Sequence, residues 1–527
     1  MFIKIQVFIL SVTLFLIQGI SSHAEPFLNV LEVGAVNDGN FKNTEVIKKA
    51  INMAAESGGG TVYFPAGNYL TGPIHMKSNI TLYIDAGATI KFSEDFDDYL
   101  PMVPTRFQGI NCNGFSPLIY GYEVENVSII GQGTVDGQGD IWQKTIKELK
   151  RKNRAGIEVP LNKWQEIYLK ENPGIKNPDQ SGFQRPLFIQ FFNSSNIKIR
   201  DINIKNSPFW TVHFVNCENV LADGLYIKNP EESSNTDGIN PESSQNVTIS
   251  NCVIDVGDDC ITIKSGKGKE ARDNYKPSKN IQILNCTMLH GAGGVAIGSE
   301  MSAGVENVVI SNCLIQNTGK GIHIKTNRER GGYVKNVRVS NVIIKDILHC
   351  HDKVPAGIHL NAMYYLRDSI EYKPVSESTP VLKNLHFSNI TLSDVEYPFY
   401  LYGLGEQSIE DVTFSDIDIR SNSGIHLKYV DGVMLNNISM ESDQKQVLIS
   451  EQVKRLRIKD FYSKESRGKN ITLKENKDVD ISISTGFPED LVIKGKTTLN
   501  VNIRGKSTDA MNIKVEEGLS NEVSLPQ

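Results

Sequence analysis

Short runs in which apolar residues alternate with other residues recur along the middle of the chain, separated by Gly, Asn, Asp or Ser. Val247-Thr248-Ile249, Ile281-Gln282-Ile283 and Val308-Val309-Ile310 are examples. A period of two residues is typical of strands that bury one face and are joined by tight turns. The pattern therefore predicts a protein built from many short strands.

A two-residue signature opens each unit of this pattern, usually Asn or Asp before an apolar residue. The pairs are 22 to 48 residues apart and are Asp201-Ile202, Asp223-Gly224, Asn251-Cys252, Asn285-Cys286, Asn312-Cys313, Asn341-Val342 and Asn389-Ile390. Units of this length without helices are typical of a β-solenoid, whose stacked coils bury columns of like residues. Leucine-rich repeats are the main alternative, but their leucine pattern is missing and β-branched residues dominate. We therefore expect an all-β solenoid with inward Ile, Val and Cys.

Two segments depart from the strand pattern. Apolar residues at helical spacing between Thr44 and Ala55, ending at Gly58, predict a short helix that caps the N-terminal end of the solenoid. Charged, Pro-containing sequence at about 143–185 predicts a side insertion near the binding face, with a helix over Lys144 to Lys152. From about residue 400 the alternation continues, which indicates further coils and a polar cap. Residues 25–527 are thus expected to form a single β-helix domain.

The first 24 residues have the features of an export signal. Lys4 precedes an apolar run from Ile5 to Ile20, and Ser22-His23-Ala24 supplies small residues at the positions that a signal peptidase reads. The run is too short for a convincing membrane span, and no other stretch approaches that length. We expect a signal peptide over 1–24 and a protein without a membrane span, exported to the periplasm or secreted.

Charge and cysteine content narrow the possible partners. The formal net charge is -6, which argues against nucleic acid and requires a local basic site for any acidic polymer. Seven Cys in 527 residues do not form a disulfide framework. Cys252, Cys286 and Cys313 occupy equivalent repeat positions and are expected to be core thiols. We expect a monomer.

Four segments align so that charged residues fall in the same few columns. They are Thr236 to Asn240, Asp258 to Lys264, Ala292 to Gly298 and Gly319 to Lys325. If the column of Ile239, Ile261, Val295 and Ile322 points inward, then residues one and three positions later point outward. The first of these outward columns holds Asn240, Thr262, Ala296 and His323, and the second holds Glu242, Lys264, Gly298 and Lys325.

The same alignment brings acidic residues together. Asp237 and Asp259 share a column, and adjacent coils lie about 4.8 Å apart. Asp258, one residue earlier than Asp259, faces the other side of the strand or is swung out by a local turn. Three neighbouring carboxyls repel one another and raise one another's pKa, which folding alone would not favour. Glycoside hydrolysis needs such a set, with an acid for the leaving oxygen and a base for water, and two carboxylates to hold the water favour inversion.

At these residues the chain resembles the polygalacturonase family, glycoside hydrolase family 28. The resemblance runs from about Asn29 to at least Tyr365, and its motifs are Gly34 to Gly39, Ser207 to Trp210, Asn235 to Gly238, Gly257 to Cys260, Gly294 to Glu300 and Gly321 to Lys325. It implies a right-handed parallel β-helix that hydrolyses galacturonic acid linkages in pectin with inversion, with no cofactor and no metal. It also implies that Asp258 is the general acid, that Asp237 and Asp259 position and deprotonate water, and that Lys325 binds a substrate carboxylate.

Two motifs differ from the family pattern. Gly291-Ala292-Gly293 stands where the family has Gly-His-Gly, so the assisting histidine is missing, although His290 lies two residues earlier. His323 stands where the family has an arginine whose fork would bind a uronate carboxylate. These changes favour a specialised member, exo-acting or specific for branched pectin, with another or a decorated sugar after the scissile bond.

Further substrate-binding candidates come from the same segments. Lys264 shares a column with Lys325, and Tyr364 follows the strand-like Ile358-His359-Leu360. The full set of expected substrate-binding residues is Asn235, Lys264, His290, His323, Lys325 and Tyr364. The expected ligand is a pectic polysaccharide or oligosaccharide that contains galacturonic acid.

Other function classes remain as alternatives. A pectate lyase could share the solenoid, but it would need a calcium site of clustered acids and an arginine base, whereas the outward columns beyond the acids hold Lys and His. A catalytically impaired carbohydrate-binding relative is the second alternative, because Ala292 and His323 replace the family His and Arg. A purely structural solenoid leaves the aligned acids unexplained.

Overall fold

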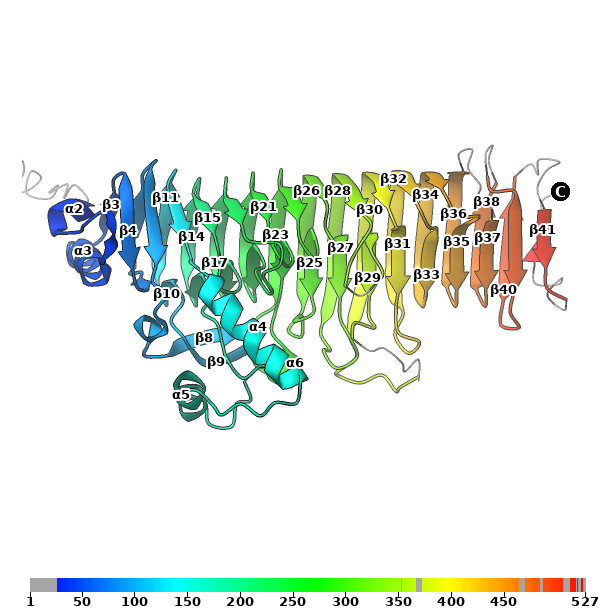
Figure 1. Ribbon diagram of the computed structural model, residues 1–527. Helices are drawn as coiled ribbons and strands as arrows, with labels where there is room; N and C mark the ends of the chain where they lie inside the picture. Colours follow the sequence, from blue (N-terminus) through cyan, green and yellow to red (C-terminus); the bar gives the residue numbers. More distant parts are fainter. Residues whose placement is uncertain are drawn as a thin grey trace, which may run out of the picture.

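The computed structural model describes residues 26–527 except 178, 180, 352, 366–371, 464–469, 484–486, 506–511, 518, 520–522 and 525–527. Within this part the chain winds into an elongated right-handed parallel β-helix, which confirms the expected all-β solenoid (Figure 1). The expected signal peptide, residues 1–24, lies outside the described residues. In the described part, the structure contains no helix that is both long and apolar enough to cross a membrane.

The coils stack as two large parallel sheets. The 15-stranded sheet carries the outward columns and consists of β5 (Ile74–His75), β10 (Ile119–Tyr122), β13 (Ile189–Phe192), β16 (Val212–Val215), β19 (Ile239–Glu242), β22 (Ile261–Ile263), β25 (Val295–Gly298), β27 (Lys320–Lys325), β29 (Ala356–Asn361), β31 (Tyr397–Tyr402), β33 (Ile425–Lys428), β35 (Gln446–Glu451), β37 (Asn470–Lys474), β39 (Asp490–Lys494) and β41 (Asn512–Val515).

The 25-stranded sheet forms the rest of each coil. Its strands are β1 (Phe27–Asn29), β2 (Asp38–Lys42), β3 (Gly60–Phe64), β4 (Gly67–Thr71), β6 (Ile80–Ile84), β7 (Ala88–Phe92), β11 (Glu125–Gly131), β12 (Thr134–Asp136), β14 (Ser195–Arg200), β15 (Asn203–Lys205), β17 (Glu218–Asp223), β18 (Tyr226–Lys228), β20 (Gln245–Ser250), β21 (Val253–Asp255), β23 (Ser278–Leu284), β24 (Thr287–His290), β26 (Val305–Gln316), β28 (Tyr333–Ile347), β30 (Val381–Val395), β32 (Ile409–Ser421), β34 (Val430–Ser442), β36 (Lys454–Ser463), β38 (Lys477–Ser482), β40 (Leu499–Arg504) and β42 (Val523–Ser524).

Inward columns of apolar residues hold the coils together. Ile239, Ile261, Val295 and Ile322 pair in register on β19, β22, β25 and β27, and each is at most 1% exposed. Burial of each such side chain contributes roughly 1.5–3 kcal/mol. The predicted register is therefore confirmed. Cys252, Cys286 and Cys313 are buried free thiols, as expected for core residues.

The asparagines that open the units form a hydrogen-bonded ladder at a corner of the coil. Asn285 and Asn312 have φ of 56° and 57°, a left-handed conformation that Asn adopts more readily than most residues. The side-chain amide of Asn285 donates to Asn251 at 3.3 Å, Asn312 donates to Asn285 at 3.3 Å, and Asn341 donates to Asn312 at 3.2 Å. The repeated Asn thus reflects a recurring corner between adjacent strands.

The N-terminal end of the solenoid is covered by helices. Helix α3 spans Thr44–Glu56 and buries Ile47, Ala50, Ile51 and Ala54 against the first coils, which confirms the predicted capping helix. A shorter helix, α2 (Val30–Val33), lies beside it at the same end (Figure 1).

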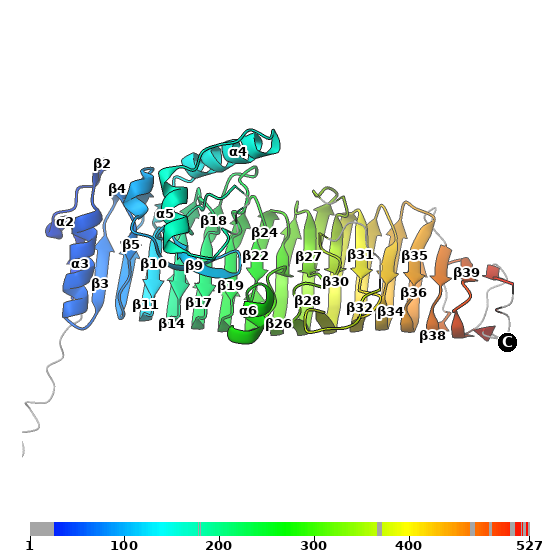
Figure 2. The same ribbon diagram turned by 90° about the horizontal axis from the view of Figure 1, so that it is seen from below.

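Additional elements lie beside the N-terminal half of the solenoid. They are helix α4 (Asp140–Arg154), helix α5 (Lys163–Glu171), the 3-10 helix η1 (Phe96–Tyr99), helix α6 (Gly268–Asn274) and the antiparallel hairpin β8 (Val103–Phe107) and β9 (Ile110–Gly114). Helix α4 begins four residues before the predicted helix at Lys144, and α5 and the hairpin are not anticipated by the sequence pattern. Figure 2 shows α4, α5 and β9 over the coils between β10 and β22. After α6, the described residues contain no further helix.

Candidate active site

Two adjacent coils carry the three aspartates, which we call the carboxylate trio: Asp237, Asp258 and Asp259. Asp237 precedes β19 and Asp259 precedes β22, and the backbone NH of Gly238 donates to the carbonyl oxygen of Asp259 at 3.0 Å. Asp237 and Asp259 therefore stack in the same column, as the alignment predicts. Asp237 is 3% exposed and Asp259 is 2% exposed.

A local turn places Asp258 differently from its neighbours. Its carboxyl accepts the backbone NH of Asp259 at 2.9 Å, and its carbonyl oxygen accepts the backbone NH of Ala292 at 3.0 Å. Asp258 is half-buried, so it is the most accessible member of the trio. Of the two sequence alternatives, the structure favours the local turn.

Two buried lysines contact the trio. Lys264 lies on the same coil as Asp259, and Lys325 lies two coils further towards the C-terminus. Lys325 Nζ lies 2.6 Å from Asp259 Oδ2. Lys264 Nζ lies 3.7 Å from Asp237 Oδ2 and 3.1 Å from Glu300 Oε2, and it sits 4.4 Å from the centre of the Trp210 ring. Lys264 is thus held between two carboxylates, Lys325 is paired with Asp259, and both lysines partly neutralise the negative charge of the site.

Burial and neighbouring carboxylates raise the pKa of two members of the trio, Asp237 and Asp258. Burial, with the charge of Asp258, raises the pKa of Asp237 well above its usual range, although the charge of Lys264 opposes this shift. Burial and the charge of Asp259 raise the pKa of Asp258. Burial would lower the pKa of Lys325, but its interactions with Asp259, Tyr364 and Asp258 together outweigh this effect, so the pKa of Lys325 lies well above its usual range. The trio can therefore retain a proton at a pH where isolated carboxyls are ionised.

Three further predicted residues lie together beside Asp259. The Tyr364 ring lies 5.5 Å from Lys325 Nζ and 6.0 Å from the His323 ring. Burial lowers the pKa of His323 well below its usual range, so this ring is neutral. Its Nε2 is buried and has no hydrogen-bond partner among the described residues. Lys325, His323 and Tyr364 thus form one surface on the C-terminal side of the trio.

Asn235 is in contact with a buried arginine. Its side-chain oxygen accepts from Arg185 Nη2 at 2.7 Å, and Arg185 Nη1 donates to the backbone oxygen of Ser234 at 2.7 Å. Arg185 therefore fixes the loop that leads to Asp237. Burial lowers the pKa of Arg185 to about 10, which still leaves it charged at neutral pH.

His290 bonds to the loops around the trio rather than to the trio itself. Its Nδ1 lies 2.9 Å from the carbonyl oxygen of Val256, and its Nε2 lies 3.0 Å from the carboxylate of Glu231. Within the described part of the chain, neither ring nitrogen bonds to a carboxyl of the trio. The structure thus gives His290 partners other than the acid that the missing family histidine would assist.

Several residues of this site escaped the sequence analysis. Trp210 and Glu300 end two of the quoted motifs, and their position there was the available signal. Arg185 lies at the end of the irregular segment at 143–185, and nothing in the local pattern indicates its role. In the part of the chain that the structure describes, no group of three or more His, Cys, Asp or Glu side chains could hold a metal ion.

The hairpin β8–β9 covers the outer face of the 15-stranded sheet on the N-terminal side of the trio. Thr105 Oγ1 donates to Gln190 at 2.7 Å, and Arg106 Nη1 donates to Ser243 at 2.9 Å. The backbone NH of Lys267 donates to the carbonyl oxygen of Gly109 near the hairpin tip at 3.2 Å.

This cover changes the accessibility of the outward columns. Gln190, His213, Asn240 and Glu242 point outward in register, yet each is 0% exposed. In contrast, Tyr400, on β31 in the outward column of His323, is half-buried. The outward column of His213 and Asn240 therefore stays buried as far as His359, which is 2% exposed, and becomes accessible at Tyr400.

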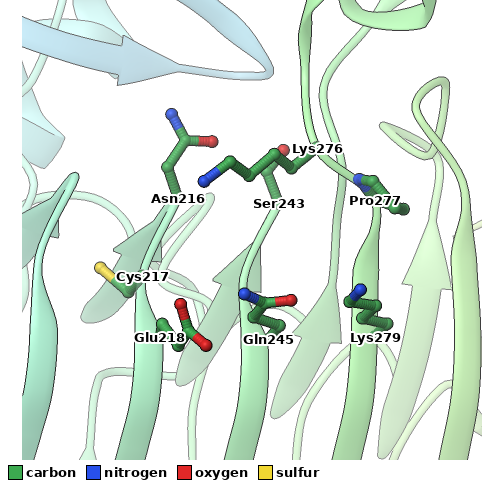
Figure 3. Close-up of a pocket in the computed structure, with 8 residues that line it drawn as sticks. All are labelled: Asn216, Cys217, Glu218, Ser243, Gln245, Lys276, Pro277 and Lys279. Carbon is green, nitrogen blue, oxygen red and sulfur yellow. The ribbon is translucent and has the colours of Figure 1, made fainter.

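A separate small pocket lies on another part of the solenoid. Its volume is about 100 Å³. Figure 3 shows the residues that line it: Asn216, Cys217, Glu218, Ser243, Gln245, Lys276, Pro277 and Lys279. It contains none of the predicted site residues. The chemistry that the carboxylate trio supports is therefore not located in this pocket.

Comparison with known proteins places these residues in a family. A model of the glycosyl hydrolases family 28 matches residues 58–434, which include the trio, both lysines and Tyr364. The chain belongs to this family. The resemblance noted from its motifs is thereby confirmed, and the matches favour a hydrolase over the lyase and the impaired binding protein.

Relatives of this hydrolase include both endo- and exo-acting enzymes. The chain is 30% identical over 397 residues to an endo-polygalacturonase of Pectobacterium carotovorum subsp. carotovorum, covering 73% of this chain and 86% of the relative. It is 28% identical over 400 residues to a probable polygalacturonase of Vitis vinifera, covering 74% of each. A solved hyperthermoactive exopolygalacturonase of Thermotoga maritima superposes with a TM-score of 0.64 at 31% identity, covering 79% of this chain and 90% of that one.

Proposed function

We propose that this family 28 hydrolase cleaves galacturonic acid linkages in pectic saccharides in a single inverting step. Asp258 donates its proton to the glycosidic oxygen as the bond from that oxygen to the anomeric carbon breaks. Water attacks the anomeric carbon from the opposite face, and its proton passes to the carboxylate pair of Asp237 and Asp259. One bond forms as the other breaks, so the configuration inverts.

The observation that carries this proposal is the assembly of three carboxyls and two buried lysines on neighbouring coils. The half-buried position and raised pKa of Asp258 suit an acid that must stay protonated until substrate binds. The contact of 2.6 Å between Lys325 Nζ and Asp259 Oδ2 supports Asp259 as a fixed member of the water-binding pair.

The surface beside Lys325 supports a neutral or decorated sugar after the scissile bond. His323 is an uncharged ring where the family has an arginine, and Lys325 is already paired with Asp259. A uronate carboxylate at this position would therefore lack the bidentate partner that an arginine provides. Ala292 next to Asp258 likewise offers no imidazole to assist the acid.

The hairpin β8–β9 supports exo action. It contacts Gln190 and Ser243 on the outer face of the sheet, whereas this face becomes accessible at Tyr400, so the saccharide is expected to extend towards the C-terminal coils. We propose that the hairpin side holds the end of the chain and that the enzyme releases a short saccharide from that end. The 31% identity to an exopolygalacturonase is in line with this proposal.

Product analysis on defined pectic oligosaccharides tests these statements together. We expect release of short products from one chain end, an inverted anomer in the first product detected by NMR, and preference for substrates with a non-uronate or branched sugar after the cleaved bond. Asp258→Asn should reduce kcat about 100- to 10,000-fold. Rapid mid-chain cleavage of plain homogalacturonan, with inactivity on branched oligosaccharides, would refute the exo and specificity proposals.

We also propose that the protein is exported after removal of residues 1–24 and acts as a monomer in the periplasm or outside the cell. The apolar run that follows Lys4 supports this proposal. Fractionation of the producing cells, N-terminal sequencing of the mature protein and sedimentation analysis test it. A mature protein that retains Met1 would contradict the export proposal.

A further inference from the structure

A series of aromatic rings leads away from the trio along the outer face of the 15-stranded sheet. The His323 ring, which lies edge-on to Tyr364, stacks on His359 at 5.0 Å with an interplanar angle of 14°. His359 contacts Tyr400 at 5.3 Å, and Tyr400 stacks on His426 at 5.3 Å with an angle of 15°. The rings of β27, β29, β31 and β33 therefore follow one another in register towards the C-terminus.

The accessible end of this series is a cluster that we call the ring platform: Tyr397, Tyr400 and His426. The Tyr397 ring lies 5.3 Å from Tyr400 and 5.2 Å from His426, so each ring contacts the other two. All three side chains belong to half-buried residues, whereas His323 is 3% and His359 is 2% exposed. The platform is thus the part of the series that a ligand can reach.

We propose that the ring platform binds the saccharide chain on the leaving-group side of the cleaved bond, beyond the sugar that contacts Lys325. Pyranose rings present C–H faces that can pack on aromatic rings, while tyrosine hydroxyl and imidazole nitrogen atoms can bond to sugar hydroxyls at the edge. The platform binds by ring contact, so it accepts neutral and acidic sugars alike. The inference rests on the proposed function of the trio.

The spacing of the coils sets how long a substrate must be to reach the platform. From β27, which carries Lys325, to β31, which carries Tyr400, there are two coil steps, or about 10 Å. A pyranose unit is similar in length to one coil step, so a chain must extend roughly two units past the Lys325 contact. Figure 2 shows β9 over the coils on the N-terminal side of β22, and β31, which carries Tyr400, on the C-terminal side of β22.

The test compares long and short substrates in a ring variant and a matched control. The measured quantity is the ratio of two kcat/KM values, that of oligosaccharides that reach the platform over that of the shortest cleaved substrate. In Tyr400→Ala this ratio should fall about three- to tenfold, because KM for the long substrates rises. Tyr400→Phe, which keeps the ring, should retain most of the ratio. Tyr462→Ala removes an exposed ring from β36, on the 25-stranded sheet, and should leave the ratio unchanged.

The alternative is that the rings only stabilise the stack of coils. In that case Tyr400→Ala would lower the melting temperature without changing the preference for long substrates, and this result would overturn the proposal. An equal loss on short and long substrates would overturn it as well.

Direct binding separates failure of this inference from failure of the proposed function. Titration calorimetry with the long oligosaccharides compares Asp258→Asn with the double variant Asp258→Asn/Tyr400→Ala, because an active protein would cleave the ligand during the titration. If the native protein hydrolyses no pectic oligosaccharide but binding is weaker in the double variant, the platform stands and the catalytic proposal fails. Equal binding by the two proteins refutes the platform, whatever the activity.

Discussion

Asp237 is held in an environment that opposes its ionisation. It is 3% exposed, and burial together with the charge of Asp258 raises its pKa well above the usual range. The folded protein therefore binds this proton more tightly than the unfolded chain does. The tighter proton binding contributes stability that is fully present below the pKa of Asp237 in the unfolded chain. This stability is lost as the pH rises through the pKa of Asp237 in the folded protein. The ionised form of Asp237, which the proposed chemistry needs, is thus the form that folding disfavours.

Asp237→Asn should stabilise the protein while it removes activity. An amide of the same shape needs no ionisation, and Lys264 keeps Glu300 as its partner at 3.1 Å. We expect the free energy of unfolding at pH 7 to rise by about 1–2 kcal/mol, and the gain to vanish below about pH 4. Denaturant unfolding at both pH values measures it. Asp273→Asn on the surface of α6 is the control. If Asp237→Asn is instead less stable than the native protein at pH 7, the neighbouring charges and hydrogen bonds compensate for the burial of the Asp237 carboxylate.

Lys264→Met should change the pH profile of hydrolysis. The charge of Lys264 opposes the rise in the pKa of Asp237 and helps to lower the pKa of Glu300 to about 2 against the effect of burial. Without this charge the base becomes harder to ionise, so the acid limb of the kcat/KM profile should move up by about one pH unit.

The control for this profile is Lys269→Met, because Lys269 is exposed on α6 and pairs there with Asp273 at 2.7 Å. Its acid limb should coincide with that of the native protein. An unshifted acid limb in Lys264→Met would mean that this lysine does not act on the titrating carboxyls.

The sequence predicts the columns of the site better than the contacts between them. Asp237 and Asp259 could be aligned because strand period and coil repeat fix which residues share a column. The partners of His290, by contrast, depend on how the loop that carries Glu231 folds over the coil. Arg185 reaches Asn235 from a segment with no periodic pattern, so its role could not be read from local sequence.

At the scale of elements, the hairpin β8–β9 is fixed by a buried ion pair. Arg106 is 0% exposed, lies 3.7 Å from Glu242 and sits 3.8 Å from the centre of the Tyr275 ring. The period-2 pattern predicted the coils, but it could not predict this hairpin, because two five-residue antiparallel strands outside the repeat leave no column to align.

Arg106→Met should therefore destabilise the protein strongly. It leaves the carboxylate of Glu242 buried without its arginine partner, and we expect a loss of about 3–5 kcal/mol in the free energy of unfolding together with faster proteolysis of the hairpin. The double variant Arg106→Met/Glu242→Gln should recover part of the loss, because the buried carboxylate that lost its arginine partner is replaced by a neutral amide. Equal stabilities of the single and double variants would contradict a role for the ion pair.

The asparagine ladder at the corner of the coils should contribute less to stability than the buried ion pair of the hairpin. Asn312→Ala removes two ladder hydrogen bonds, of 3.3 Å and 3.2 Å, and places alanine at φ of 57°. We expect a loss of about 1–3 kcal/mol in denaturant unfolding. Asn312→Gly removes the backbone strain but does not restore the hydrogen bonds. Its free energy of unfolding should therefore lie between those of the native protein and Asn312→Ala. An Asn312→Gly as unstable as Asn312→Ala would assign the cost to hydrogen bonds alone.

At the scale of the whole molecule, stacking makes each coil depend mainly on its neighbours. The family match ends at residue 434, yet strands in parallel register continue to β42. The continuing alternation allowed these coils to be predicted, although no catalytic motif marks them. Their inward residues, such as Leu473 and Ile493 on β37 and β39, extend the core of the preceding coils.

Truncation after Glu451 should accordingly lower the stability of the protein but leave its hydrolytic activity largely unchanged. The cut follows β35 and keeps a coil between the new end and His426 on β33, while the trio lies several coils away, just before β19 and β22. We expect kcat/KM for the shortest substrate to stay within about twofold of the native value. Solubility and the free energy of unfolding should fall, because strands β34 and β35 become open edges. Sedimentation analysis and denaturant unfolding measure these losses alongside the activity. A soluble, folded truncated protein without activity would show instead that the C-terminal coils are coupled to the carboxylate trio over the length of the solenoid.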